Sequence, residues 1–141
     1  LSGTYEIVIP EYYDGYPVTK IEDNAFYNNN SITAITITKN IIVVGDKAFY
    51  DCDKLKKITI TNVKLQSLGN ECFAGCFNLG IVYFSGEKDE WISIKKGEKW
   101  DIDCGHNNYN SGYWLNYSGD SEFIDHNYYK DHPDEKPDYS Y

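Results

Sequence analysis

The feature that most constrains this chain is an internal repeat of 23 to 24 residues that runs from about Val18 to Gly86. Successive copies place Phe26, Phe49 and Phe73 at the same position of the repeat. Three further columns keep the same intervals: Ile21, Val44 and Leu68; Ala25, Ala48 and Cys72; and Ile32, Leu55 and Leu79. Self-similarity at a period of this length is typical of solenoids, in which similar units stack in a row. We therefore expect a stack of units.

Each unit ends in a segment whose apolar and polar side chains alternate. The alternating apolar pairs are Ile35 and Ile37, Ile58 and Ile60, and Val82 and Phe84. A period of two places one set of side chains in a core and the other set in solvent, as in a β-strand. The segment YEIVIP, with Ile7 and Ile9, predicts one more strand upstream, which an inserted DGYP turn separates from the first full unit.

The middle of each unit predicts a turn. In DNAFYNNNSI of the first copy and DKAFYDCDKL of the second, apolar residues recur at spacings near three and four, and an Asp or Asn precedes the small residue. One strand and one turn cannot bury an apolar face alone, so neighbouring units must supply the other half of each contact. The predicted fold is an α/β repeat: a solenoid with a parallel β-sheet on one face and short helical or 3₁₀ turns on the other.

The pattern I-x-x-x-A-F-x-x-C-x-x-L-x-x-I-x-I resembles the BspA-like leucine-rich repeat family, the bacterial surface-antigen type. Two positions depart from it, because Asn29 stands where the next units have Cys52 and Cys76, and Cys72 replaces the alanine. The resemblance implies a leucine-rich-repeat solenoid that is secreted or exposed at the cell surface. It also implies a role in binding or adhesion.

The sequence changes in character after the last copy of the repeat. Residues 1–86 hold a partial N-terminal repeat and three full ones. We expect residues 87–118 to close the stack as a C-terminal cap that buries Trp91, Trp100 and Trp114, and a recognition surface built from such rings is the alternative. Residues 119–141 are acidic and rich in tyrosine, without periodicity, and we interpret them as a weakly ordered tail or linker.

The charge of the chain argues against nucleic acid as a partner. The formal net charge at pH 7 is −9, from 22 acidic and 13 basic residues, and every basic residue is lysine. Binding to phosphate backbones needs clustered cations, and bidentate recognition of phosphate favours arginine. The sequence also has no run of about 18 apolar residues, so it predicts no membrane span.

The residues that could carry catalysis form no known motif. The sequence has none of the standard nucleophile, metalloprotease or phosphate-binding patterns, and no nucleophile stands at a defined spacing from His106, His126 or His132. Cys72, Cys76 and Cys104 lack the paired spacing of zinc sites. We therefore predict no enzyme activity, no cofactor and no metal.

Two alternatives stay open from the sequence. We expect Cys52 and Cys76, which share a column, to be buried thiols that act as small apolar side chains, and a disulfide between them is the alternative. The acidic groups Asp101-x-Asp103 and Asp120, Glu122 and Asp125 offer oxygen ligands for calcium, although they lack the glycine and the terminal glutamate of an EF-hand loop.

The outward side chains of the predicted strands would form a regular platform, because successive strands lie about 4.8 Å apart. Threonines on this platform are explained by strand propensity. The lone cation Lys57, the aliphatic Ile81 and the aromatic Tyr83 are not explained by strand propensity. The predicted contact residues are Lys57, Ile81, Tyr83, Thr36 and Thr59. We expect them to bind a protein of a host or a matrix, with a glycan as the alternative ligand. The rival hypothesis is a structural spacer that carries another domain.

Overall fold

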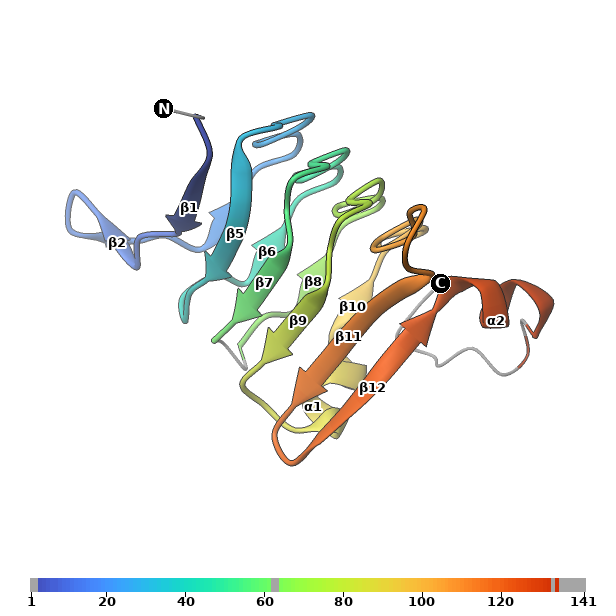
Figure 1. The fold of residues 1–141 in the computed structure, drawn as a ribbon. Coiled ribbons are helices and arrows are strands. Elements are labelled where there is room, and N and C mark those ends of the chain that lie inside the picture. Colours follow the sequence, from blue (N-terminus) through green and yellow to red (C-terminus); the bar gives the residue numbers. More distant parts are fainter. Residues whose placement is uncertain (1–2, 62–63, 133, 135–141) are drawn as a thin grey trace.

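The computed structural model describes residues 3–61, 64–132 and 134, and it shows strands stacked side by side along one axis (Figure 1). The main sheet has six strands in the order β1 (Tyr5–Val8), β5 (Ile32–Ile37), β7 (Lys57–Ile60), β9 (Ile81–Phe84), β11 (Gly112–Tyr117) and β12 (Asp120–Asp125). Neighbours from β1 to β11 pair in parallel, whereas β12 pairs with β11 in the antiparallel sense. The predicted solenoid with a parallel sheet is confirmed.

A second, parallel sheet lies behind the main sheet in Figure 1. Its four strands are β10 (Lys95–Lys96), β8 (Ser67–Leu68), β6 (Val43–Val44) and β4 (Lys20–Ile21). Each unit passes from a strand of this second sheet, through a turn, to a strand of the main sheet. The remaining elements are the hairpin of β2 (Tyr12–Tyr13) and β3 (Tyr16–Pro17), and the helices α1 (Lys88–Ser93) and α2 (His126–Asp131).

The segment between the two strands of a unit is a series of tight turns. In the first unit the backbone N–H of Ala25 donates to the carbonyl of Glu22, and that of Tyr27 donates to Asn24, both over 3.2 Å. Asn24 and Asn28 have φ values of 58° and 56°, and a residue with positive φ interrupts a regular helix. The expected helical or 3₁₀ segment is therefore a run of single turns.

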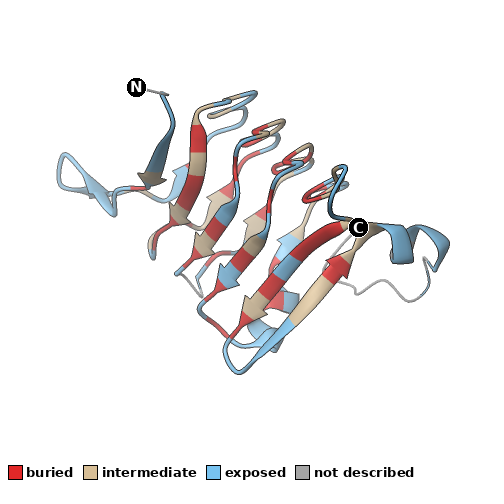
Figure 2. Cartoon of the chain, in the orientation of Figure 1, coloured by how far each residue is buried: buried red, intermediate tan, exposed pale blue. Residues whose placement is uncertain are grey.

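Stacked phenylalanine rings fill the core. Phe49 lies between Phe26 and Phe73, with ring centroids 5.1 and 5.0 Å away and the planes within 12° and 4° of parallel. Phe49 and Phe73 are fully buried, and the inward residues of β5, β7 and β9 are buried as well (Figure 2). The phenylalanine column that the repeat predicted is thus a continuous stack through the units.

A glycine fixes the close approach of one unit to the next. Gly69 lies against the preceding unit, where a Cβ atom would be only 2.6 Å from the backbone nitrogen of Asp46. The Asp46 carboxylate accepts a hydrogen bond of 2.9 Å from the backbone N–H of Asn70, and Asp23 accepts one from Asp46 in the same way. This ladder holds successive turns in one register.

The expected C-terminal cap contains a fourth, degenerate unit. The backbone N–H of Phe73 donates to the carbonyl of Trp100, just as that of Phe49 donates to Cys72. Trp100 therefore takes the small-residue position, and Asp101 takes the phenylalanine position.

The prediction that three tryptophans are buried is right for two of them and wrong for the third. Trp91 and Trp100 are buried, which confirms it, but Trp114 is 49% exposed, which makes it wrong for this residue. Trp114 lies between the inward residues Tyr113 and Leu115 of β11, so its side chain must point outward.

The expectation of a weakly ordered tail from residue 119 is wrong for residues 120–125. These form β12, which pairs with β11 along its whole length and buries Ile124. The expected boundary after residue 118 falls in the turn of this hairpin. Residues 133 and 135–141 of the expected tail lie outside the described residues.

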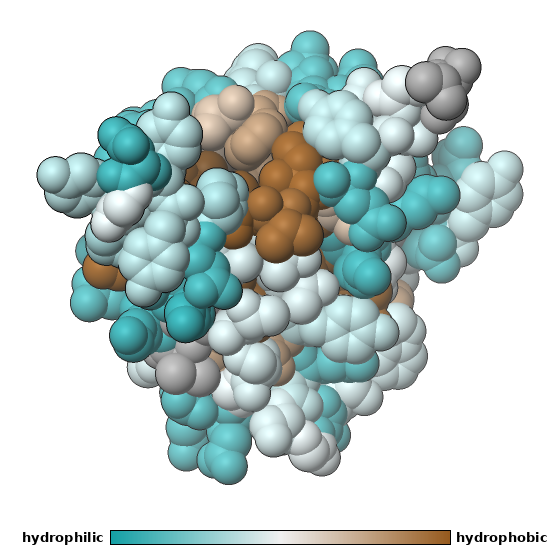
Figure 3. Space-filling model, turned by 90° about the vertical axis from the view of Figure 1, so that its left-hand side faces the viewer, coloured by the Kyte–Doolittle hydropathy of each residue, from teal (hydrophilic) through white to brown (hydrophobic). Residues whose placement is uncertain are grey.

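The two ends of the stack differ. At the C-terminal end, Trp91, Trp100 and Tyr113 are buried. At the N-terminal end, Ile7 and Phe26 are only partly buried although they pack against the core. Figure 3, which views this end, shows an apolar area surrounded by polar side chains.

Candidate binding site on the strand face

The register of the main sheet brings the predicted contact residues together on its outward side, here called the strand face. Lys57 lies beside Ile81, and Thr59 lies beside both Thr36 and Tyr83. These side chains alternate along the strands with the buried residues of the core, so they share one face. The geometry thus assembles all five residues, and their role as contacts stays a prediction.

Strand β11 extends this surface with two residues that sequence reasoning missed as contact residues. Trp114 lies directly beside Ile81, and Asn116 lies beside Tyr83. The alternation in GYWLNY, with Tyr113, Leu115 and Tyr117 inward, is a signal that predicts a strand with an outward tryptophan. It went unused because an inserted helix and a loop displace β11 from the spacing of the repeat.

An apolar patch occupies the C-terminal part of the strand face, made of Ile81, Tyr83, Trp114 and Phe123. Trp114 and Phe123 pair across β11 and β12, with ring centroids 5.3 Å apart and an interplanar angle of 64°. Tyr83 is 43% exposed, and Ile81 and Phe123 are half-buried. Large apolar side chains clustered in solvent mark binding surfaces more often than isolated ones do.

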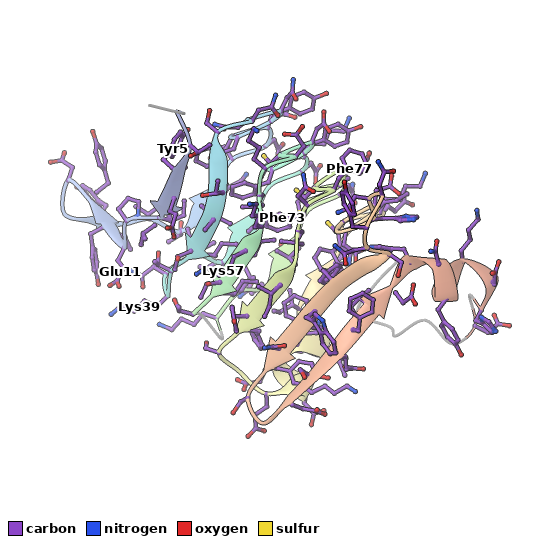
Figure 4. The ribbon with its side chains drawn as sticks, in the orientation of Figure 1. Tyr5, Glu11, Lys39, Lys57, Phe73 and Phe77 are labelled. Carbon is purple, nitrogen blue, oxygen red and sulfur yellow. The ribbon has the colours of Figure 1, made fainter. Side chains whose placement is uncertain are left out.

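Lys57 lies next to this patch, and the outward Asp125 of β12 lies two residues from Phe123. Eight outward residues are aligned on β5, β7, β9 and β11, and Lys57 is the charged one among Ala34, Thr36, Lys57, Thr59, Ile81, Tyr83, Trp114 and Asn116. Lys57 comes from β7 in the middle of the sheet (Figure 4). Within the described part of the chain no carboxylate forms an ion pair with it, whereas Lys39 pairs with Glu11 at 3.4 Å.

The cysteines are buried free thiols, as expected for small apolar side chains. Desolvation raises the pKa of Cys52 to about 12, and it raises the pKa values of Cys72 and Cys104 well above their usual range. These thiols stay protonated at neutral pH, so they are poor nucleophiles and poor metal ligands.

The acidic residues considered for calcium have other partners. Asp101 is buried and accepts a hydrogen bond of 2.6 Å from the hydroxyl of Tyr113. Asp125 caps α2 by accepting from two backbone N–H groups. Among residues 3–61, 64–132 and 134, no cluster of three or more histidine, cysteine or acidic side chains could hold a metal ion.

Lys96 of β10 is a half-buried cation in the fourth unit. It takes the column position of Val44 and Leu68, donates to the carbonyl of Trp91, and lies with its Nζ 4.3 Å from the centroid of the Trp91 ring. Desolvation lowers the pKa of Lys96 to about 7, and the nearby Asp101 opposes this shift. This group belongs to the cap and lies on the second sheet, away from the strand face.

The helices of the described chain are all too short or too polar to cross a membrane.

Comparison with known proteins identifies the repeat. The structure is similar to that of a leucine-rich repeat protein from Bacteroides capillosus, with a TM-score of 0.58 and 23% identity over 81% of this chain and 77% of that one. A leucine-rich repeat protein from T. pallidum aligns with a TM-score of 0.49 and 24% identity over 72% of this chain and 56% of that one. The first likeness shows the fold alone. A search of curated proteins gives no significant match.

The sequence itself identifies the family. The model for the BspA type leucine-rich repeat region (6 copies) matches residues 6–95, which is well over half of the chain. The chain belongs to the BspA-type leucine-rich repeat family.

Proposed function

We propose that this chain is a non-enzymatic binding or adhesion module that recognises a protein of a host or a matrix through its strand face. The observation that carries the proposal is the apolar patch beside Lys57. Solenoid repeats present extended surfaces of this kind, on which outward side chains of successive units meet one partner. The repeat family and its fold are generally non-catalytic, which agrees with a binding role.

The proposed location is the outside of the cell or its surface. The support is the family, whose bacterial members include surface antigens. Thiols that are buried and protonated, as Cys52 is, tolerate an oxidising environment because oxidants react with exposed thiolates.

Binding of the purified chain to immobilised matrix proteins, host-cell extracts and glycans tests the proposal. The test variant is Lys57→Glu with Tyr83→Ala, which changes the charge and one exposed ring of the strand face. The matched control is Lys54→Glu with Tyr109→Ala, because both of these residues are exposed and lie in turns away from the face. Circular dichroism and the melting temperature should stay unchanged in both variants.

We expect the test variant to lose binding to the captured partner and the control to keep it. Equal binding by the two variants would place the contact elsewhere on the molecule. Binding to none of the ligands would favour the structural spacer, whereas capture of glycans alone would favour the alternative ligand class.

A further inference from the structure

The strand face differs in charge from the rest of this acidic chain. The formal net charge is −9, yet the aligned outward residues of β5, β7, β9 and β11 include no carboxylate and one cation, Lys57. The outward carboxylates lie on the two edge strands: Glu6 of β1 is separated from Lys57 by Ala34, and Asp125 of β12 caps α2. A partner with a negative charge is repelled by most of this protein and attracted at Lys57.

The apolar patch lies at a fixed distance from this charge. Lys57 and Trp114 stand in one row, with Ile81 between them. Two strand spacings separate them, which is about 9.6 Å between their backbones. Tyr83 is two residues along β9 from Ile81, so both exposed rings lie on the same side of Lys57.

The chemistry of the patch favours a peptide chain over a saccharide. Ile81 and Phe123 present aliphatic and aromatic surface that suits apolar side chains. The hydroxyl groups of a sugar need several planar polar partners, and Asn116 is the one such residue among the aligned outward positions of β5 to β11. Thr59 and Asn116 can bond to the backbone of an extended segment.

We propose that the partner segment is an acidic and apolar stretch of protein. In this arrangement an aromatic or large aliphatic side chain packs on Trp114 and Tyr83, and an Asp or Glu carboxylate about three residues away in an extended chain pairs with Lys57. This inference rests on the proposed function of the strand face and names the chemistry of its ligand.

Selection of random peptides displayed on phage, with the full chain immobilised, provides the probe. Bound phage are eluted with soluble chain, and the enriched sequences are synthesised and titrated. We expect these peptides to combine an aromatic residue with Asp or Glu. Trp114→Ser should weaken their binding about 30-fold, as for an interface anchor, and Lys57→Glu about 3- to 10-fold, more at low salt than at high salt. Lys54→Glu is the matched control and should change the affinity less than about 2-fold.

A second selection on the Lys57→Glu variant separates charge from shape, because the enriched peptides should then carry Lys or Arg in place of the acid. Peptides that depend on Trp114 and Tyr83 but ignore the charge at position 57 would overturn this inference and leave the proposed function standing. Peptides whose binding is also unaffected by substitution of Trp114 and Tyr83 would contradict both this inference and the proposed function of the strand face. If neutral glycans bind in a way that depends on Trp114 and no peptide binds, the proposal that the partner is a protein would be overturned.

Discussion

The thiol of Cys76 donates a hydrogen bond of 3.3 Å to the backbone carbonyl of Phe49 in the preceding unit. The same bond recurs between Cys104 and Phe73 at 3.0 Å. A third bond of this kind joins Cys52 to Phe26 at 3.2 Å. The cysteine column therefore links neighbouring turns, which gives each thiol a structural partner and explains why the column persists into the fourth unit.

Alkylation tests this account of the thiols. In the native protein we expect all four cysteines to resist iodoacetamide at about pH 8, because all four are buried and the raised pKa values of Cys52, Cys72 and Cys104 suppress the thiolate of these three. Mass spectrometry should show no adduct on the folded chain and four after denaturation. Rapid labelling of Cys52 or Cys76 in the folded state would contradict their placement in the core.

Replacing Phe49 with alanine should lower the free energy of unfolding by about 3 to 5 kcal/mol, because the ring is buried and stacked on both sides. Urea denaturation measures the change. Phe26→Ala is the comparison: this ring is stacked on Phe49 and only partly buried, so its loss should be smaller. Equal losses at the two positions would show that the ends of the stack are as well packed as its centre.

Gly69→Ala should destabilise the stack far more than Gly80→Ala. A methyl group at Gly69 would lie 2.6 Å from the backbone nitrogen of Asp46, whereas one at Gly80 would be 3.6 Å from the carbonyl of Lys56, an ordinary contact. Melting temperatures of the two variants, compared with the parent chain, check the difference. A Gly69→Ala variant that melts with the parent would mean that the spacing between turns is not set by this glycine.

Ending the chain at Gly119 should lower the melting temperature by several degrees or more, because this removes β12 and the buried Ile124. The point variant Ile124→Ala isolates the packing contribution and should cost about 2 to 5 kcal/mol. If both proteins unfold like the parent, the hairpin contributes nothing to closing the stack.

Stability should rise with pH above neutrality through Lys96. Its pKa is lowered from 10.5 to about 7 in the folded chain, so between these values the unfolded state binds the extra proton. The free energy of unfolding therefore increases with pH across this window, and below pH 7 the cost of the half-buried charge is present in full. Denaturation of the parent and of Lys96→Met from about pH 6 to pH 9 should show a rising difference in favour of the parent. A constant difference would mean that Lys96 titrates alike in both states.

The sequence predicts the solenoid because neighbouring units must bury each other. This requirement places apolar residues at the same position of each unit, as at Phe26, Phe49 and Phe73. It also predicts which strand residues face outward, since Lys57, Ile81 and Tyr83 follow from alternation alone. It does not predict the turn geometry. Lys47 and Glu71 have positive φ values, but lysine and glutamate rarely adopt such values, so these residue types do not signal the turn.

The fourth unit escaped prediction for two reasons. Insertion of α1 places Lys96 28 positions after Leu68, outside the period of the earlier units. At the last position of a stack, the apolar columns also give way to polar or bulky residues, here Lys96, Trp100 and Asp101, because no further unit must fit against them. Because that unit was not recognised, the alternation that points Trp114 outward went unused as a sign of the strand face.

The in-register sheet also sets the distance between outward side chains in fixed steps, one step for each unit. Each unit contributes one strand to the main sheet, so inserting one unit between β7 and β9 would move Tyr83 away from Lys57 by about 4.8 Å and change neither side chain. The separation between a charged contact and an apolar one is then a count of units. Gain or loss of whole units would retune the reach of the surface in fixed steps, with the chemistry at each step left intact.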